Sequence, residues 1–313
     1  MHGCSATAPG EIPVRHWGEI ARRVGRHTMG DQMPLLSAGV AFFATLSIAP
    51  VLVTALAVYA KVNSPAEALQ ELHGVVAMLP EQLRPVVAEQ ATTIADASTR
   101  VTTPRGVLGL LFALSTATTA ATYLIDALTL AYHETESRSL LRRSGLALAF
   151  VLSGALLLGA VMTGVGAVWR SVEGSPLVVR DAAHGLLWVC LGAVMVAVLA
   201  VLYRFAPDRT PARWCWVSWG ATIATVLWLL TSLGFSVYVQ HLSTYESTYG
   251  SLAGVAISML WVWITVLLVM LGAVVNAEAE RQTYADSTVG PARPLGQRQA
   301  AVADSVPPYE RTR

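Results

Sequence analysis

The sequence predicts an all-α, polytopic membrane protein with six transmembrane helices. Of its 313 residues, 54% are hydrophobic and only 13% are charged, about half the charged share of an ordinary soluble domain. The apolar residues also gather in long runs that arginine-bearing loops separate. Each run reaches the roughly 20 residues that a helix needs to cross a bilayer. The runs cover residues 36–59, 106–132, 145–169, 182–205, 214–239 and 249–276.

The N-terminal arm, residues 1–35, precedes the first run. Between Val14 and Arg26 it mixes apolar positions with four arginines, a pattern that predicts a short helix at the membrane interface. A charged arm without membrane contact is the alternative. The arm does not resemble a cleaved signal, because the following apolar run is far longer than the 7–15 residues of a signal h-region.

The membrane domain is expected to cover residues 36–282, and its longest loop spans about 61–105. Apolar residues recur in this loop at steps of three and four, which predicts amphipathic helices broken near Pro80 and Pro85. The loop is too polar to span, so we expect it to lie over the outer mouth of the bundle. Residues 283–313 are rich in Pro, Gly, Arg, Asp and Ser, which predicts a disordered cytoplasmic tail.

The arginines predict the orientation of the chain. Six spans place both termini on one side of the membrane. The short segments on that side hold about twice as many basic residues as the opposite side. Basic residues are enriched in cytoplasmic loops, so both termini are expected in the cytoplasm of a bacterial cell.

Polar side chains form stripes inside four of the runs. In the second run, Ser115, Thr119, Thr122 and Asp126 recur at steps of three and four, which places them on one helical face. The first, fifth and sixth runs also carry spaced hydroxyls, whereas the third and fourth carry few and suit contact with lipid. We therefore expect a candidate substrate cavity lined by Ser47, Pro50, Thr54, Ser115, Thr119, Thr122, Asp126, Thr222, Thr225 and Ser258.

Each of these features has a structural alternative. Serine and threonine commonly donate to a carbonyl of their own helix, and Asp126 lies within reach of Arg142 or Arg143. Pro50 is expected to kink the first helix, as prolines do with or without a cavity. Gly250 and Gly254 form a GxxxG pair at the start of the sixth run, which predicts close helix packing.

Acidic residues stand at the end of the sixth run. Asn276, Glu278, Glu280 and Arg281 lie where this helix leaves the membrane. Carboxylates are unfavourable at a helix C-terminus, so they suggest outside partners, with the arginines near 142 and between 204 and 213 as the nearest candidates. The hypothesis is a cytoplasmic clamp made by these four residues. The alternative is that the helix runs on into solvent and the carboxylates are hydrated.

Several functional classes find no support in the sequence. It contains no Walker A loop, no HExxH and no GxSxG, and Cys4, Cys190 and Cys215 lack metal-binding or disulfide spacing. His133, Glu134 and Glu136 share one loop without a trustworthy ligand spacing. We therefore expect no catalytic residue, cofactor or metal. A net charge of +1 also argues against nucleic-acid binding.

Three stretches resemble the YihY/BrkB family of bacterial inner-membrane proteins. They are LSAGVAFFATLSIAP at 36–50; YRFAP at 203–207 followed by Trp219, Gly220, Ala221 and Trp228; and YESTYGSL at 245–252 together with LWVW at 260–263 and GAVVNAEAER at 272–281. The resemblance covers about residues 15–283, and Thr129 departs from it where the family pattern suggests Asn. It implies six spans and cytoplasmic termini. Family members have been linked to serum resistance, one branch to lipid or lipopolysaccharide export, and an older label to ribonuclease activity.

Together these features favour a non-enzymatic transporter or flippase-like protein of the cytoplasmic membrane. Its substrate would be amphiphilic or lipid-linked, and membrane lipids would be its partners. A non-transporting scaffold for envelope assembly is the alternative. A membrane-embedded hydrolase is the least favoured, and the ribonuclease label is disfavoured because no carboxylate or histidine cluster stands in a soluble domain.

Overall fold

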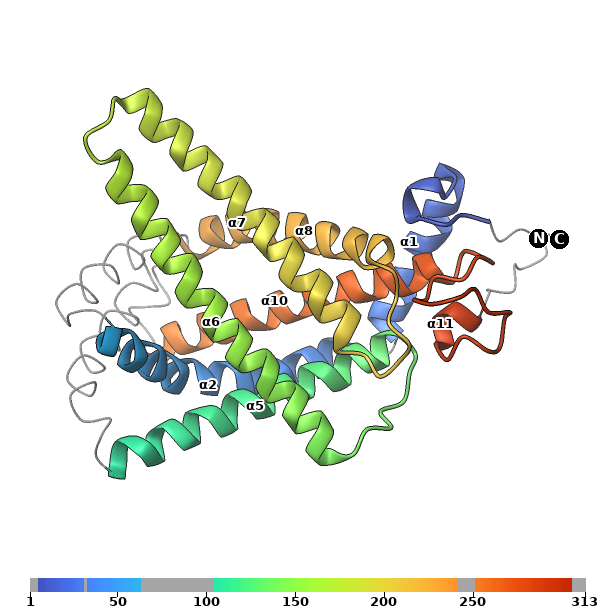
Figure 1. Ribbon diagram of the computed structural model, residues 1–313, viewed down its shortest axis with the longest axis horizontal. Coiled ribbons are helices and arrows are strands. Elements are labelled where there is room, and N and C mark those ends of the chain that lie inside the picture. The colour runs from blue at the N-terminus through green and yellow to red at the C-terminus, as the bar shows by residue number, and fades with distance from the viewer. Residues whose placement is uncertain (1–4, 31–32, 63–103, 241–250, 306–313) are drawn as a thin grey trace.

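The computed structural model describes residues 5–30, 33–62, 104–240 and 251–305, and in these ranges the chain is helical (Figure 1). No β-strand is present in the described part; a single bridge joins Ala212 and Thr288. The all-α prediction is thus confirmed for these residues. The helices are η1 (Pro9–Glu11), α1 (Val14–Gly30), α2 (Met33–Val62), α5 (Pro104–Ala131), α6 (Leu140–Val172), α7 (Leu177–Phe205), α8 (Trp214–Gln240), α10 (Ser251–Glu280) and α11 (Ala301–Asp304).

Four of the described helices, namely α6, α7, α8 and α10, are long and apolar enough to cross a membrane. The helices α2 and α5 have 30 and 28 residues and coincide with the first two apolar runs. Six membrane crossings therefore stay a prediction, although six long helices are present. Nearly all of the loop at 61–105, where amphipathic helices were expected, lies outside the described residues.

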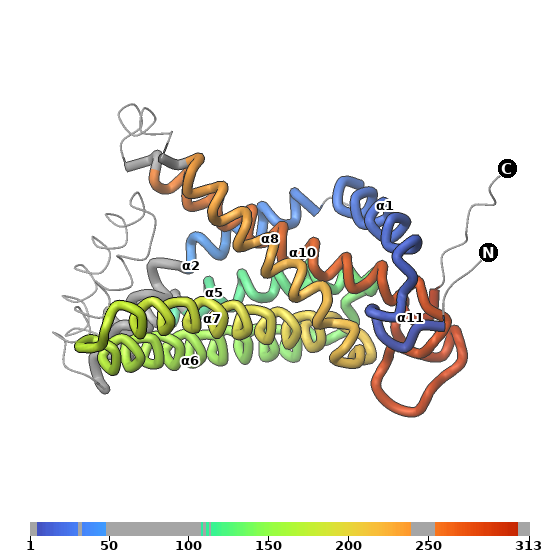
Figure 2. Tube along the Cα trace, turned by 90° about the horizontal axis from the view of Figure 1, so that it is seen from above, coloured from blue at the N-terminus to red at the C-terminus, as the bar shows by residue number. Residues whose placement is uncertain are grey.

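The long helices pack in a continuous series. The helix α10 lies against both α2 and α8, α5 packs on the far side of α2, and α6 and α7 flank α5 and α8 respectively. The helices α6 and α7 form a hairpin along one edge (Figure 2). Only Ala147 is buried in α6, and α7 is buried only at Leu199, Ala200 and Tyr203. This exposure fits the expectation that the third and fourth runs contact lipid.

Buried side chains gather at one end of the bundle, here called the inner end, where α5 and α7 end, α6 and α8 begin, and α1 and α11 lie (Figure 1). Leu128, Tyr132, Trp216, Val217 and Met270 are fully or almost fully buried there. Toward the opposite end, large apolar side chains are exposed, among them Leu111, Trp188 and Leu233. The helices are therefore tightly packed at the inner end.

Two glycines allow α8 and α10 to cross closely at the inner end. A Cβ atom added at Gly220 would lie less than 3.0 Å from the carbonyl oxygen of Gly272, and one added at Gly272 would lie 2.7 Å from that of Gly220. Small residues permit such backbone contact between membrane helices. The sequence pointed instead to Gly250 and Gly254: Gly254 is half-buried and Gly250 lies outside the described residues.

The segment after α10 is folded as far as residue 305, where the sequence suggested disorder. Arg298 is buried and donates to the carbonyl oxygens of Tyr284 and Ala303, each at 2.8 Å. Asp286 accepts from the backbone N–H groups of Thr288 and Arg293, and these hydrogen bonds outweigh its burial and lower the pKa of its carboxyl group. The hydrogen bonds of Arg298 hold this segment in a fixed fold, although the average composition of the segment predicts disorder.

Substituting either crossing glycine by alanine should destabilise the protein. We expect Gly220→Ala to lower the free energy of unfolding by about 1–3 kcal/mol, the usual effect of an extra methyl group in a packed interior. Thermal unfolding in detergent measures this. Gly234→Ala is the matched control, because nothing lies within 4 Å of a Cβ atom at that position of the same helix. Equal stability of the two variants would contradict the close crossing.

Candidate functional site

The inner end of α10 carries three buried polar residues, Asn276, Glu278 and Glu280, which are at most 2% exposed. The carboxylates are therefore not hydrated at the end of a helix that runs on into solvent, which was the alternative. The helix α1, the loops on either side of the α6–α7 hairpin and the folded tail surround this end (Figure 1). Each polar side chain therefore needs partners within the protein.

Asn276 joins α10 to α8. Its side-chain oxygen accepts from the backbone N–H of Gly220 at 2.7 Å, and its amide donates to the carbonyl of Val217 at 3.2 Å. Both contacts depend on the close approach of the two helices. Asn276 therefore joins α10 to α8 by two hydrogen bonds at the close helix crossing that Gly220 and Gly272 permit.

Glu280 pairs with Arg209, one of the loop arginines proposed from the sequence. An Arg209 guanidinium nitrogen lies 2.7 Å from Glu280 Oε2, and the two side chains are 2% and 0% exposed. The hydroxyl of Ser287 donates to the same oxygen at 2.9 Å. Burial lowers the pKa of Arg209, but the charge and hydrogen bond of Glu280 outweigh it and raise that pKa overall. The guanidinium of Arg209 is therefore held in its charged form.

Glu278 pairs with an arginine from the N-terminal arm. Arg23 Nε donates to Glu278 Oε2 at 2.6 Å, and a second Arg23 nitrogen donates to Gln282 at 2.8 Å. Arg281 lies 3.2 Å from the other carboxylate oxygen, Oε1. The loop arginines proposed from the sequence do not reach Glu278, and Arg281 belongs to the cluster as proposed.

The two faces of α1 explain how Arg23 reaches this site. Ile20, Val24 and His27 are buried, and Arg23 is half-buried beside them. The exposed positions carry Arg15, Arg22 and Arg26. The helix is amphipathic, as predicted, but its apolar face covers the inner end of α10. One of the four arginines thus points inward while the others remain at the surface.

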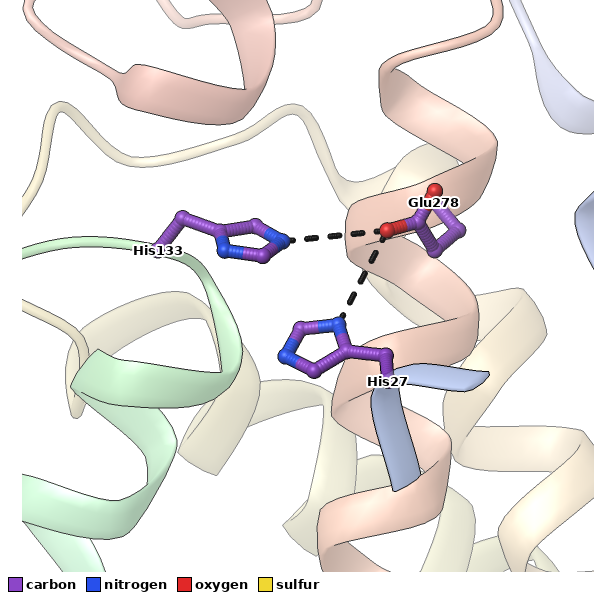
Figure 3. Close-up of side chains that lie close together, drawn as sticks. All are labelled: His27, His133 and Glu278. Carbon is purple, nitrogen blue, oxygen red and sulfur yellow. Dashed lines mark ion pairs between the residues drawn. The ribbon is translucent and has the colours of Figure 1, made fainter. Parts of the chain in front are cut away.

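Two histidines face the same carboxylate (Figure 3). Nδ1 of His27 and Nε2 of His133 each lie 3.7 Å from Oε1 of Glu278. Their rings are stacked, with centroids 4.4 Å apart. The three side chains come from α1, from the turn after α5 and from α10. They are the one group of three metal-ligating side chains brought together within the described part of the chain.

Polar contacts tie the loops of the inner end together. Asp208 accepts from the N–H of Ser137 at 2.8 Å and from Arg138 Nε at 3.0 Å. Burial raises the pKa of Asp208, but the hydrogen bonds of Ser137 and Arg138 lower it more. Glu134 accepts from the N–H of Ala301 at 2.6 Å, and its burial raises its pKa. Both loops and the tail thus form one cap.

Asp126 pairs with Arg143 of α6. The shortest distance is 3.0 Å, and the two side chains are 33% and 24% exposed, Asp126 being the more exposed. This is the Asp–Arg pair considered as an alternative from the sequence. At this position the polar face of α5 meets α6, whereas the cavity predicted from the sequence is shared with the first, fifth and sixth runs.

The hydroxyls of the polar face of α5 bond their own helix. Ser115, Thr119 and Thr122 each donate at 2.8 Å to a carbonyl three or four residues earlier. Ser115 is exposed and the two threonines are half-buried. The buried face of α5 carries mainly alanines and other apolar residues, together with Thr116 and Thr129. The polar face is therefore a half-exposed strip whose Asp126 end contacts α6.

The other candidate cavity residues are dispersed. Ser47 and Thr225 are buried, Ser258 is half-buried and Thr222 is exposed. All four donate to carbonyls of their own helices. The side chains of Pro50 and Thr54 lie outside the described residues. Every described hydroxyl in the set thus bonds its own helix, and the shared cavity stays a prediction.

Comparison with known proteins identifies the family. The family described as Virulence factor BrkB matches residues 24–295. The chain belongs to the BrkB family. The match includes GAVVNAEAER at 272–281, the stretch at the end of α10 that carries part of the resemblance.

Curated relatives of this BrkB-family chain are membrane proteins or carry a ribonuclease-like name. It is 28% identical over 249 residues to the putative ribonuclease-like protein YfkH of Bacillus subtilis, covering 77% of this chain and 88% of that protein. It is 33% identical over 123 residues to a UPF0761 membrane protein of Tolumonas auensis, covering 39% and 38%. It is 24% identical over 270 residues to one of Verminephrobacter eiseniae, covering 86% and 64%.

The chain thus spans less than two thirds of the length of several relatives that it matches. No solved structure matches it.

Sequence reasoning missed the partners that the BrkB-family fold brings from far along the chain. Arg23 and His27 lie about 250 residues before Glu278, and no local spacing links them. One available signal was helical spacing in α1. Arg23 lies three residues after Ile20 and His27 three residues after Val24, which places them on the same helical face. His133 suggested only local groupings, with Glu134 and Glu136 and with the polar face of the second run, and none with His27 or Glu278.

Removing Arg209 should destabilise the protein strongly. The substitution Arg209→Ala leaves the fully buried Glu280 without its cation, which typically costs about 3–5 kcal/mol of unfolding free energy. Thermal unfolding of the purified protein measures it, with the exposed Arg142→Ala as control. The double variant Arg209→Leu/Glu280→Leu should recover most of the loss. If Arg209→Ala unfolds like the control, the ion pair contributes nothing.

Proposed function

We propose that this BrkB-family membrane protein is a transporter or flippase-like protein for an amphiphilic or lipid-linked substrate, and that the inner end of α10 forms its cytoplasmic clamp. The observation that carries the proposal is the pair of buried carboxylates. Glu278 and Glu280 bind arginines that come from two different segments, Arg23 of α1 and Arg209 of the loop before α8.

A buried ion pair suits a contact between two segments that opens and closes better than it suits a permanent contact. Removing two charges from water is expensive, and apolar side chains of similar size often hold a fold at least as well. When such a contact opens, water hydrates both charges and offsets the attraction that is lost. An apolar contact lacks this compensation. Charged partners on separate segments therefore suit a closure that separates and forms again.

The distribution of packing supports a state that is closed at the inner end. Buried side chains gather there, whereas α6, α7 and the far part of α8 expose large apolar residues. The half-exposed polar strip of α5 holds Ser115, Thr119 and Thr122 and meets α6 at Asp126. Such a strip suits an amphiphile whose headgroup follows the hydroxyls while its chains remain in lipid.

The same features leave room for a scaffold. The helix α1, two loops and the folded tail form a cap joined by polar contacts, and such a cap offers a surface for docking other envelope proteins. A scaffold requires this surface but no movement of the clamp. The two functions therefore differ in whether breaking the ion pairs of α10 changes lipid movement.

A charge exchange tests the clamp. In vesicles with a fluorescent phospholipid as probe, wild-type protein should move the probe between leaflets, as followed by chemical quenching of the outer leaflet. We expect Glu278→Arg to reduce this movement at least fivefold and Arg23→Glu/Glu278→Arg to restore about half of it. Glu19→Arg, at an exposed position of α1, is the control. Movement equal to that of protein-free vesicles for the wild type would favour the scaffold.

The proposed orientation places the inner end in the cytoplasm. The exposed arginines of this end, Arg15, Arg22, Arg26 and Arg142, support it by the enrichment of basic residues in cytoplasmic segments. In a cysteine-free background, Glu173→Cys at the far end should react with an impermeant thiol reagent in intact cells. Val289→Cys, exposed in the tail, should react only after lysis. Labelling of Val289→Cys in sealed cells would reverse the orientation.

A further inference from the structure

We propose that His27, His133 and Glu278 form a binding site for a transition-metal dication of the zinc type. Two imidazoles and one carboxylate are an established set of protein ligands for zinc, with a fourth position left for water. The three ligand atoms lie within 4.8 Å of one another (Figure 3). They converge from three segments that are far apart in the sequence.

The distances suit a shared ion better than direct hydrogen bonds. Each histidine nitrogen lies 3.7 Å from Glu278 Oε1, beyond the 2.7–3.2 Å range of an N–H···O bond. Ligand atoms placed 2.0–2.1 Å from a tetrahedral zinc are about 3.3 Å apart. Small rotations of the two rings therefore bring all three atoms to coordinating distance.

The backbone at His133 is an independent observation. The N–H of Glu134 bonds the carbonyl of Thr129, and the N–H of His133 bonds that of Leu130. This is the Schellman motif that ends a helix, and His133 holds its left-handed position, with φ at 56°. Glycine usually occupies this position because it has no Cβ atom to strain. Strained residues that persist in a fold are concentrated at functional sites.

The surrounding arginines define how the ion would bind. Arg23 holds Oε2 of Glu278 at 2.6 Å and leaves Oε1 for the metal, as supporting groups around metal ligands do. Arg281 lies 3.2 Å from Oε1 and competes with a cation there. Its side chain is 24% exposed and also contacts the hydroxyl of Ser305, so it can turn toward water when the ion enters.

Zinc is the preferred choice among the dications. Imidazole ligands select zinc, copper, nickel and iron over magnesium and calcium, which favour oxygen. The described part of the site offers no thiolate that would favour monovalent copper. The bound ion would join α1, the turn after α5 and α10 by coordinate bonds. This inference does not depend on the transport proposal, because metal binding is measured without any substrate.

Equilibrium binding of zinc tests the site. Full-length protein, purified through a tag without histidines and stripped with a chelator, is titrated with zinc chloride. Bound metal is then counted by elemental analysis after desalting. We expect one zinc per chain in the wild type, and an at least tenfold weaker affinity in His27→Asn. His16→Asn is the matched control, since His16 is also buried on α1. Thermal unfolding should shift upward with zinc in the wild type and the control only.

Two further variants separate metal binding from folding. His133→Gly relieves the left-handed backbone and should leave the apo protein at least as stable, yet it should lose zinc. Arg281→Gln removes the competing cation and should tighten binding about tenfold. With cobalt as probe, the visible absorption should be that of a tetrahedral nitrogen and oxygen site. Zinc binding that is absent, or unchanged in His27→Asn and His133→Gly, would overturn the proposal.

Discussion

The placement of two carboxylates at the C-terminal end of α10 constrains the rest of the inner end. A helix C-terminus already carries partial negative charge, and Glu278 and Glu280 are both almost fully buried there. Neither is tolerable without cations close by. Arg23 and Arg209 supply them from opposite sides of the helix. The positions of α1 and of the loop before α8 follow from this requirement as much as from apolar packing.

The close crossing of α8 and α10 makes these pairs possible. With Gly220 and Gly272 in contact, Asn276 reaches the backbone of α8. The loop before α8 is then near enough for Arg209 to reach Glu280. A wider crossing would separate these partners and expose the carboxylates. Apolar packing in the bundle and charge pairing at its end are therefore parts of a single arrangement.

Length and periodicity were enough to predict the helices, because both are properties of consecutive residues. The six long helices coincide with the six apolar runs, and a polar face of α5 and an amphipathic α1 are present. The destination of each polar side chain was harder to predict. Asp126 pairs with Arg143 of the adjacent helix. Glu280 pairs with Arg209, one of the loop arginines that the sequence suggested. The contacts of Arg23 and His27 with Glu278 were not predicted, because tertiary contacts between α1 and α10 leave no local pattern in the sequence.

Average composition misled at the tail. Residues 283–313 are rich in Pro, Gly, Arg, Asp and Ser, yet Arg298 donates to several carbonyls at once and the segment folds around it. Such a centre depends on one residue and its geometry, so a composition summed over 30 residues cannot reveal it. The glycines at the helix crossing are a second example. Gly250 and Gly254 form a recognisable motif, whereas Gly220 and Gly272, which make the close crossing, are 52 residues apart and form none.

The order in which the chain is made gives the burial of Arg209 a further meaning. The ribosome delivers α1 and the loop before α8 long before α10, so Arg23 and Arg209 emerge without their carboxylates. The inner end cannot reach its final packing until the last long helix has entered the membrane. A chain truncated before α10 would leave Arg23 and Arg209 without their carboxylate partners. The two ion pairs of the inner end can therefore form only after α10 has been made.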